Sequence, residues 1–167
     1  MPKVLVLFDN ADQNADGLAE LVSAGAKTVR FTEVDVRVLG EPSVSSRRRR
    51  LESADEIEQY DGVIVVGSDP GISPAFDSLL GALGRRGTAE FDDRVFAAVP
   101  ASSATRQRLS DVGGIIVGVR AGAADAESEA RKTGERVARV TEWVRHALSH
   151  EDGHGQPHHA HSHHHSH

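Results

Sequence analysis

The polar residues that could bind a ligand gather in three short segments, residues 9–16, 67–73 and 100–105. Each segment follows an apolar run and is rich in acidic, amide, hydroxyl or small residues. Such side chains, together with backbone N–H groups, orient small molecules in binding sites. The same residue types also cap helices and form turns, so the alternative is that these segments are plain connections.

Nucleophilic and acid–base chemistry finds little support in the residue types. The chain has no Cys, and its first His is His146. A disulfide, a thiolate nucleophile and a cysteine-bound metal are therefore excluded, and a hydrolase with a histidine-based triad is disfavoured. The pattern is compatible with hydride transfer, in which a cofactor carries the chemistry and the protein positions it.

Histidine is confined to the end of the chain, from His146 to His167. Residues 150–167 contain no apolar residue able to anchor a fold, which predicts a disordered His-rich tail after a domain of residues 1–149. Neutral imidazoles bind Ni²⁺, Cu²⁺ or Zn²⁺. The predicted metal ligands are His158, His159, His161, His163, His164, His165 and His167.

Short apolar segments predict five β-strands, at residues 4–8, 32–38, 63–66, 95–99 and 115–119. The first, third and fourth segments are continuous, which is typical of strands covered on both faces. The second alternates with charged residues, which favours a half-exposed edge strand. Gly118 interrupts the fifth, which also suits an edge.

Apolar residues at helical spacing predict helices in the gaps between these strands. Ala54 to Tyr60 is one of them, with Ser53 as its N-cap and Glu56 completing a capping box. The others are expected at residues 18–29, 76–84, 102–109 and 130–148. The alternation predicts a three-layer, flavodoxin-like, doubly wound parallel sheet of five strands in the order 2-1-3-4-5.

The ligand crevice of such a sheet lies beyond the carboxyl ends of the strands, where the strand order reverses. Here that point falls between the first and third strands, so residues 9–16 and 67–73 should meet there. Residues 100–105, after the fourth strand, should lie beside them. We therefore expect a crevice formed by residues 9–16, 68–73 and 101–105.

Four segments, residues 1–8, 22–26, 60–68 and 126–138, carry a resemblance to a known family. In order and spacing the chain resembles the WrbA-type NAD(P)H:quinone oxidoreductases, which have a flavodoxin-like fold. The resemblance implies FMN bound at the three loops, with hydride passing from NAD(P)H to the flavin and then to a quinone. It also implies homo-oligomers.

The three loops supply all the cofactor-binding residues that this resemblance implies, and no residue is assigned a catalytic role. The implied residues are Asn10, Ala11, Asp12, Gln13, Asn14, Ala15, Ser68, Asp69, Pro70, Gly71, Ile72, Ala101, Ser102 and Ser103.

The first loop departs from the family pattern, which offers a hydroxyl residue and a glycine to the FMN phosphate. Asn10 stands at the hydroxyl position and Gln13 at the glycine position, while Asp9, Asp12 and Asp16 add negative charge. Two like unit charges about 4 Å apart repel by roughly 4 kcal/mol at an effective dielectric constant near 20. The departure favours a second hypothesis, a non-catalytic flavodoxin-fold binding protein with a degenerate flavin site.

A third reading is a phospho-receiver domain, which shares this strand order and holds Mg²⁺ through carboxylate oxygens. Asp9 and Asp69 would be the ligands, and Ser102 or Ser103 the hydroxyl after the fourth strand. The lysine that such domains carry after the fifth strand is missing, because Arg120 is the nearest cation.

Charge and hydropathy restrict the partners. The chain carries 19 Lys and Arg against 25 Asp and Glu, a net charge of −6, which disfavours nucleic acid as a partner. No apolar run approaches the roughly 20 residues of a membrane span, and the amino terminus does not resemble a signal peptide. A cytoplasmic location is expected. Arg47 to Arg50 form a basic run, either an attractor of anionic groups or a solvated loop.

Overall fold

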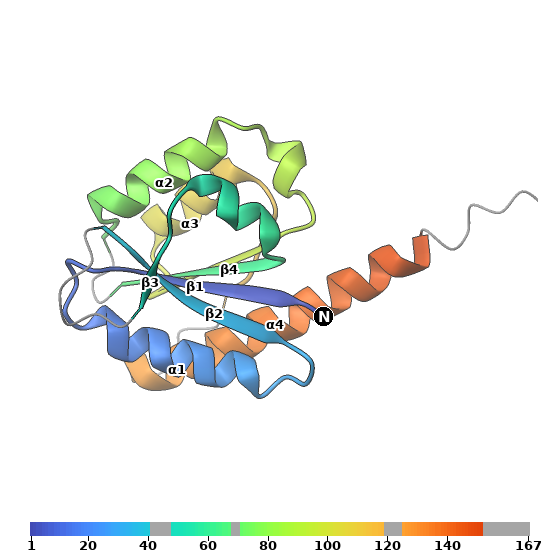
Figure 1. Cartoon of the computed structure of the whole chain (residues 1–167), viewed down its shortest axis with the longest axis horizontal. Coiled ribbons are helices and arrows are strands. Elements are labelled where there is room, and N and C mark those ends of the chain that lie inside the picture. Colours follow the sequence, from blue (N-terminus) through green and yellow to red (C-terminus); the bar gives the residue numbers. More distant parts are fainter. Residues whose placement is uncertain (41–47, 68–70, 119–124, 152–167) are drawn as a thin grey trace, which may run out of the picture.

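The computed structural model of the chain describes residues 1–40, 48–67, 71–118 and 125–151. Strands and helices alternate along most of this length, as expected (Figure 1). In chain order the elements are β1 (Lys3–Asp9), α1 (Ala15–Lys27), β2 (Glu33–Leu39), β3 (Arg49–Arg50), η1 (Ala54–Gln59), β4 (Gly62–Val66), α2 (Pro74–Gly84), η2 (Thr88–Phe91), β5 (Val95–Val99), α3 (Ser103–Val112), β6 (Ile115–Ile116) and α4 (Ala126–Glu151).

The strands form one parallel sheet in the order β3-β2-β1-β4-β5-β6. The predicted order 2-1-3-4-5 is confirmed for β2, β1, β4, β5 and β6. The predicted count of five strands is wrong, because the short strand β3 pairs with β2 through Arg37–Arg49 and Val38–Arg50. Two arginines show no apolar periodicity, so sequence patterning could not indicate this strand.

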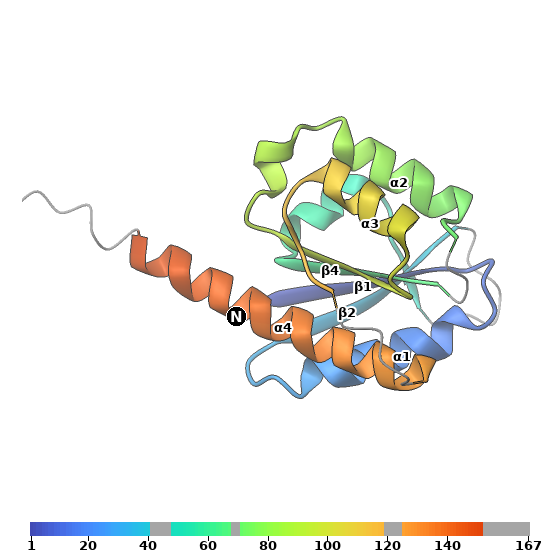
Figure 2. The same ribbon diagram turned by 180° about the vertical axis from the view of Figure 1, so that it is seen from behind.

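Two apolar cores lie on opposite faces of the sheet, because successive strand residues point to opposite sides. On β1, Val4 and Val6 pack with α1 and α4, whereas Leu5 and Leu7 pack with η1, α2 and α3. Figures 1 and 2 show the resulting three layers, with α1 and α4 below the sheet and α2 and α3 above it. This is the predicted flavodoxin-like architecture.

Local helix details differ from the expectations in two places. The segment Ala54–Gln59 is a 3₁₀-helix, and the Ser53 hydroxyl makes no capping hydrogen bond. The Glu56 carboxylate instead accepts the backbone N–H of Glu52, so the predicted capping box does not form. Helix α4 runs through Glu151, so the boundary expected after residue 149 falls inside a helix. The seven histidines predicted to bind metal lie outside the described residues.

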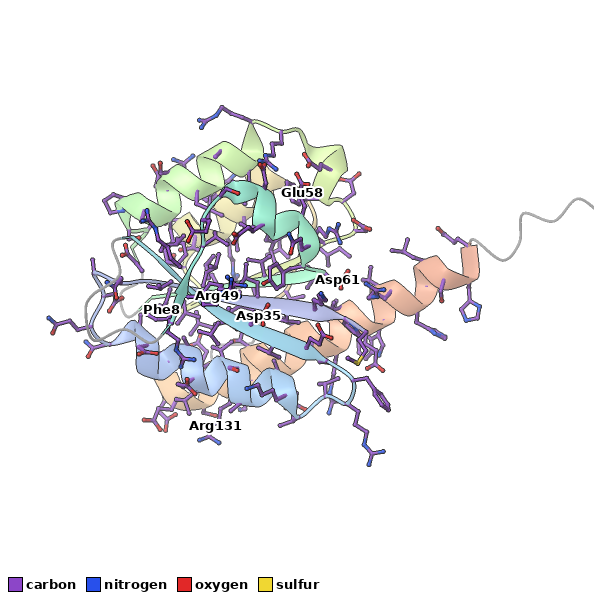
Figure 3. The ribbon with its side chains drawn as sticks, in the orientation of Figure 1. Phe8, Asp35, Arg49, Glu58, Asp61 and Arg131 are labelled. Atoms are coloured by element: carbon purple, nitrogen blue, oxygen red, sulfur yellow. The ribbon has the colours of Figure 1, made fainter. Side chains whose placement is uncertain are left out.

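Helices α1 and α4 approach closely at two glycines. A Cβ atom on Gly25 would lie 2.0 Å from the backbone O of Arg131, and one on Gly134 would lie 2.0 Å from the O of Val22. Backbone therefore meets backbone at this crossing. Arg131, labelled in Figure 3, lies on the α4 side of the contact. The contact fixes the position of α1, whose first turn follows the first predicted site loop.

A buried carboxylate ties α4 to the amino end of the sheet. Asp61, which precedes β4 and is labelled in Figure 3, is 13% exposed in its side chain. It accepts hydrogen bonds from the Lys3 N–H at 2.9 Å, from Arg94 at 3.3 Å and from Arg145 at 2.9 Å. The carboxyl-terminal end of α4 projects past the body of the protein (Figures 1 and 2).

Candidate functional site

A cleft lies at the carboxyl ends of β1 and β4, where the strand order reverses. In Figure 1 this end lies opposite the marked N-terminus, and Phe8, labelled in Figure 3, lies close to it. The cleft has a volume of about 440 Å³. Its lining consists of Asp9, Ala11, Asp12, Gln13, Val66, Gly67, Gly71, Ile72, Ser73, Pro74 and Phe76.

A smaller cavity of about 30 Å³ continues from this cleft toward β5. It shares Val66, Gly67, Gly71, Ile72 and Phe76 with the cleft and adds Pro100 and Thr105 from the third loop, among others. Described residues of all three loops therefore lie together at one end of the sheet. The strand order predicted from the sequence had indicated this position for the loops.

The first loop is held together by its own carboxylates. Asp9, which is 7% exposed, accepts the N–H of Ala11 through Oδ1 at 2.9 Å. Asp12 accepts the N–H of Asn14 through Oδ1 at 3.1 Å. Both hydrogen bonds close local turns of the kind that an Asp side chain makes with the backbone N–H two residues ahead.

Further backbone bonds close the same loop. The Asn10 N–H donates to the O of Leu39 at 3.0 Å, the Asp12 N–H to the O of Asp9 at 3.0 Å, and the Ala15 N–H to the O of Asp12 at 3.3 Å. The N–H groups of Asn10, Ala11, Asp12, Asn14 and Ala15 are thus all engaged within the protein.

This geometry does not fit the phosphate of FMN. A phosphate at a helix N-terminus is bound by backbone N–H groups and by the positive end of the helix dipole. Here five N–H groups of the first loop already face protein acceptors, and two carboxylates line the cleft beside them. The third acid, Asp16, is paired with Arg48, and neither residue lines the cleft.

The opposite wall of the cleft is apolar and includes the start of helix α2. Ile72 and Phe76 line the cleft on this side, and Pro74 occupies the first helical turn. Ser73 caps the helix by accepting the Phe76 N–H at 3.3 Å. A cap followed by proline at the first helical position is a common helix start. The wall is therefore a preformed surface.

The hydroxyl groups of Ser102 and Thr105 in the third loop stabilise the start of helix α3. Ser102 caps α3 by accepting the Thr105 N–H at 3.1 Å, and its hydroxyl lies 2.8 Å from that of Thr105. The Ala101 N–H donates to Glu129 at 3.4 Å, and Ser103 is exposed. Ala101, Ser102 and Ser103 were expected to bind a cofactor, but none of them lines either cavity.

The remaining predicted site residues divide into three groups. Ala11, Asp12, Gln13, Gly71 and Ile72 line the cleft. Asn10, Asn14 and Ala15 do not line it, and Ala15 is buried in the core below the sheet. Ser68, Asp69 and Pro70 lie outside the described residues.

Sequence reasoning missed several lining residues that belong to regular elements rather than loops. These are Val66, Pro74 and Phe76. The Ser-Pro pair at 73–74 carried a usable signal, since it marks a helix start beside the crevice. Phe76 was placed in a helical stripe, and its contribution to the cleft needed the packing of α2.

The alternative chemistries have little support within the described part of the chain. No cluster of three or more metal-ligating side chains occurs there, and Asp69, a receiver-type ligand, falls outside it. Arg48 pairs with Asp16 and Glu20, while Arg49 and Arg50 are exposed on β3. No described helix is long and apolar enough to cross a membrane.

No protein-family model matches the sequence, and no curated protein sequence matches it. Solved structures resemble the fold. A Streptococcus pneumonia flavodoxin matches with a TM-score of 0.58 at 13% identity, over 82% of this chain and 98% of that one. A short-chain flavodoxin associated with a PDU bacterial microcompartment matches with a TM-score of 0.59 at 11% identity, over 84% and 99% of the two chains.

A third structure, two-electron reduced Megasphaera elsdenii flavodoxin, matches with a TM-score of 0.51 at 16% identity, over 81% of this chain and 98% of that one. Identities this low establish the fold alone. The protein has a flavodoxin-like fold with a cleft at the topological switch point.

Proposed function

We propose that this chain is a flavodoxin-fold binding protein whose cleft takes a planar, uncharged heteroaromatic molecule, such as riboflavin, in preference to a phosphorylated one. The cleft volume of about 440 Å³ falls within the roughly 300–1,000 Å³ of small-molecule sites. The apolar wall that Ile72 and Phe76 provide suits a flat ring. A few polar groups opposite an apolar wall are typical of such sites.

The observation that carries this proposal is the hydrogen bonding of Asp9 and Asp12. Their carboxylates accept the N–H groups of Ala11 and Asn14, two of the groups that a phosphate would need. Unit charges of the same sign about 4 Å apart repel by roughly 4 kcal/mol at an effective dielectric constant near 20. A bound anion would face this repulsion and would find these two N–H donors already engaged.

The second candidate function is FMN-dependent electron transfer from NAD(P)H to a quinone. It is favoured by the likeness to flavodoxins and to a protein named flavone reductase, which matches with a TM-score of 0.56 at 14% identity, over 87% of this chain and 65% of that one. It requires FMN in the same cleft, although Asn10 and Gln13 stand where the family has a hydroxyl residue and a glycine. The two candidate functions therefore differ in whether the cleft binds the phosphate of FMN or disfavours it.

The His-rich segment is proposed as a separate metal-binding region, independent of the cleft. The support is compositional, because His158, His159, His161, His163, His164, His165 and His167 crowd into ten residues. Imidazole suits Ni²⁺, Cu²⁺ and Zn²⁺.

Riboflavin titration, followed by quenching of its fluorescence, tests cleft binding. Gly71→Leu should fill the cleft, because a Cβ at Gly71 meets nothing within 4 Å. This variant should weaken binding by about tenfold or more, a loss of about 1.4 kcal/mol. Gly17→Leu, at an exposed glycine outside the cleft lining, is the matched control and should bind like the wild type. The proposal would be overturned if riboflavin binding did not saturate, or if Gly71→Leu and the wild type bound riboflavin with equal affinity.

A further inference from the structure

Two exposed histidines on the projecting end of α4 face each other. His146 and His150 are separated by one helical turn, and their Nε2 atoms lie 3.1 Å apart. Their rings are nearly perpendicular, at 88°, with centroids 4.5 Å apart. Residues four apart lie on the same side of a helix, so the helix itself holds this pair together.

The separation of the two nitrogens suits one metal ion. Zinc–imidazole bonds are about 2.0–2.1 Å long, which places two ligand nitrogens about 2.9 Å apart at a 90° angle and about 3.3 Å apart at a tetrahedral angle. The observed 3.1 Å falls between these values. A bound ion would replace the hydrogen bond that now joins the two ring nitrogens.

We propose that His146 and His150 form a two-histidine chelate for a divalent transition metal such as Ni²⁺ or Zn²⁺. Two imidazoles at this spacing on a helix are a recurrent ligand arrangement. No group of three or more such ligands occurs among the described residues. This site is distinct from the cleft, which lies at the other end of the sheet.

The surroundings of the pair leave it available. The neighbouring cation Arg145 is held by the Asp61 carboxylate at 2.9 Å and 3.0 Å, which directs its charge toward the sheet. The Ser149 hydroxyl donates to the backbone O of His146 at 2.7 Å, so it does not compete for the rings. A bound ion would join two adjacent turns of α4 beyond the body of the protein.

The test uses the full chain with every histidine after Glu151 replaced by glutamine, so that only His146 and His150 remain. Calorimetric titration with NiCl₂ should show one ion bound per chain. Loss of an outer hydrogen-bond partner of a ligand already weakens metal affinity about 10- to 100-fold. His150→Gln in this background should therefore weaken Ni²⁺ binding at least about tenfold.

The matched control keeps two histidines in the wrong geometry. Ala147→His combined with His150→Ala preserves the residue count but places the two rings on adjacent positions, which do not face each other on a helix. It should bind Ni²⁺ as weakly as His150→Gln. Equal affinity in the background chain and this control, or no Ni²⁺ binding by the background chain, would overturn the proposal.

Discussion

Substitution of Gly25 by Ala should separate the two helices that lie below the sheet. The new Cβ would lie 2.0 Å from the Arg131 O, whereas ordinary contact begins at 3.4 Å, so the backbones must move apart by 1.4 Å, the difference of the two values. Overpacking of this kind typically costs about 1–3 kcal/mol. Ala is the better helix former by about 1 kcal/mol, which offsets part of the cost.

The matched control is Gly17→Ala in the same helix. A Cβ at Gly17 meets nothing within 4 Å, so this variant should gain stability by up to about 1 kcal/mol from helix propensity alone. Urea unfolding followed by circular dichroism measures both free energies. We expect Gly25→Ala to be the less stable by about 1–3 kcal/mol, since the gain in helix propensity is shared by both variants. Equal stability of the two variants would refute the view that backbone contact sets the spacing of α1 and α4.

Three further predictions concern the sheet and the tail. Asp61→Asn should lower the unfolding free energy by about 1.5–3 kcal/mol, because its hydrogen bonds are charge-assisted; an effect no larger than that of exposed Asp93→Asn would contradict this. Burial and the Asp35 hydrogen bond raise the pKa of Tyr60, the one tyrosine, from 10.0 to about 12. Phenolate absorbance should therefore appear near pH 12 in the wild type and at a lower pH in Asp35→Asn. The stability that this hydrogen bond contributes is present below pH 10 and should be lost as the pH rises toward 12. Titration of Tyr60 at the ordinary pKa of 10.0 would show an exposed phenol. Deletion of residues 152–167 should remove most Ni²⁺ uptake but leave the melting temperature nearly unchanged; a large drop would mean that the tail packs on the body.

The sheet could be predicted because its strands carry simple patterns. Continuous apolar runs at residues 4–8, 63–66 and 95–99 identified buried strands, and the strand order followed from the alternation with helices. The pair Arg49–Arg50 could not be recognised, since two charged residues in a strand depend on a partner, here β2. The crossing of α1 and α4 was equally invisible, because Gly25 and Gly134 are remote in sequence and meet only in the fold.

The location of the cleft followed from the switch-point rule, but its chemistry did not. The acids at positions 9 and 12 were evident, yet the sequence could not show that each would accept a backbone N–H of its own loop. Ser102 was expected at a cofactor, whereas it caps α3. A hydroxyl can serve either purpose, and only the surrounding backbone decides between them.

The affinity of the protein for FMN relative to riboflavin tests the account most directly. The two ligands share the ring and differ in the phosphate, so wild type should bind riboflavin more tightly. Asp12→Asn removes one charge but keeps an oxygen for the Asn14 N–H, and it should improve FMN binding by about tenfold or more relative to riboflavin. Asp16→Asn, whose carboxylate pairs with Arg48 away from the cleft lining, should leave the ratio unchanged. Tighter binding of FMN than of riboflavin, unaffected by Asp12→Asn, would contradict the account and favour the FMN-dependent oxidoreductase.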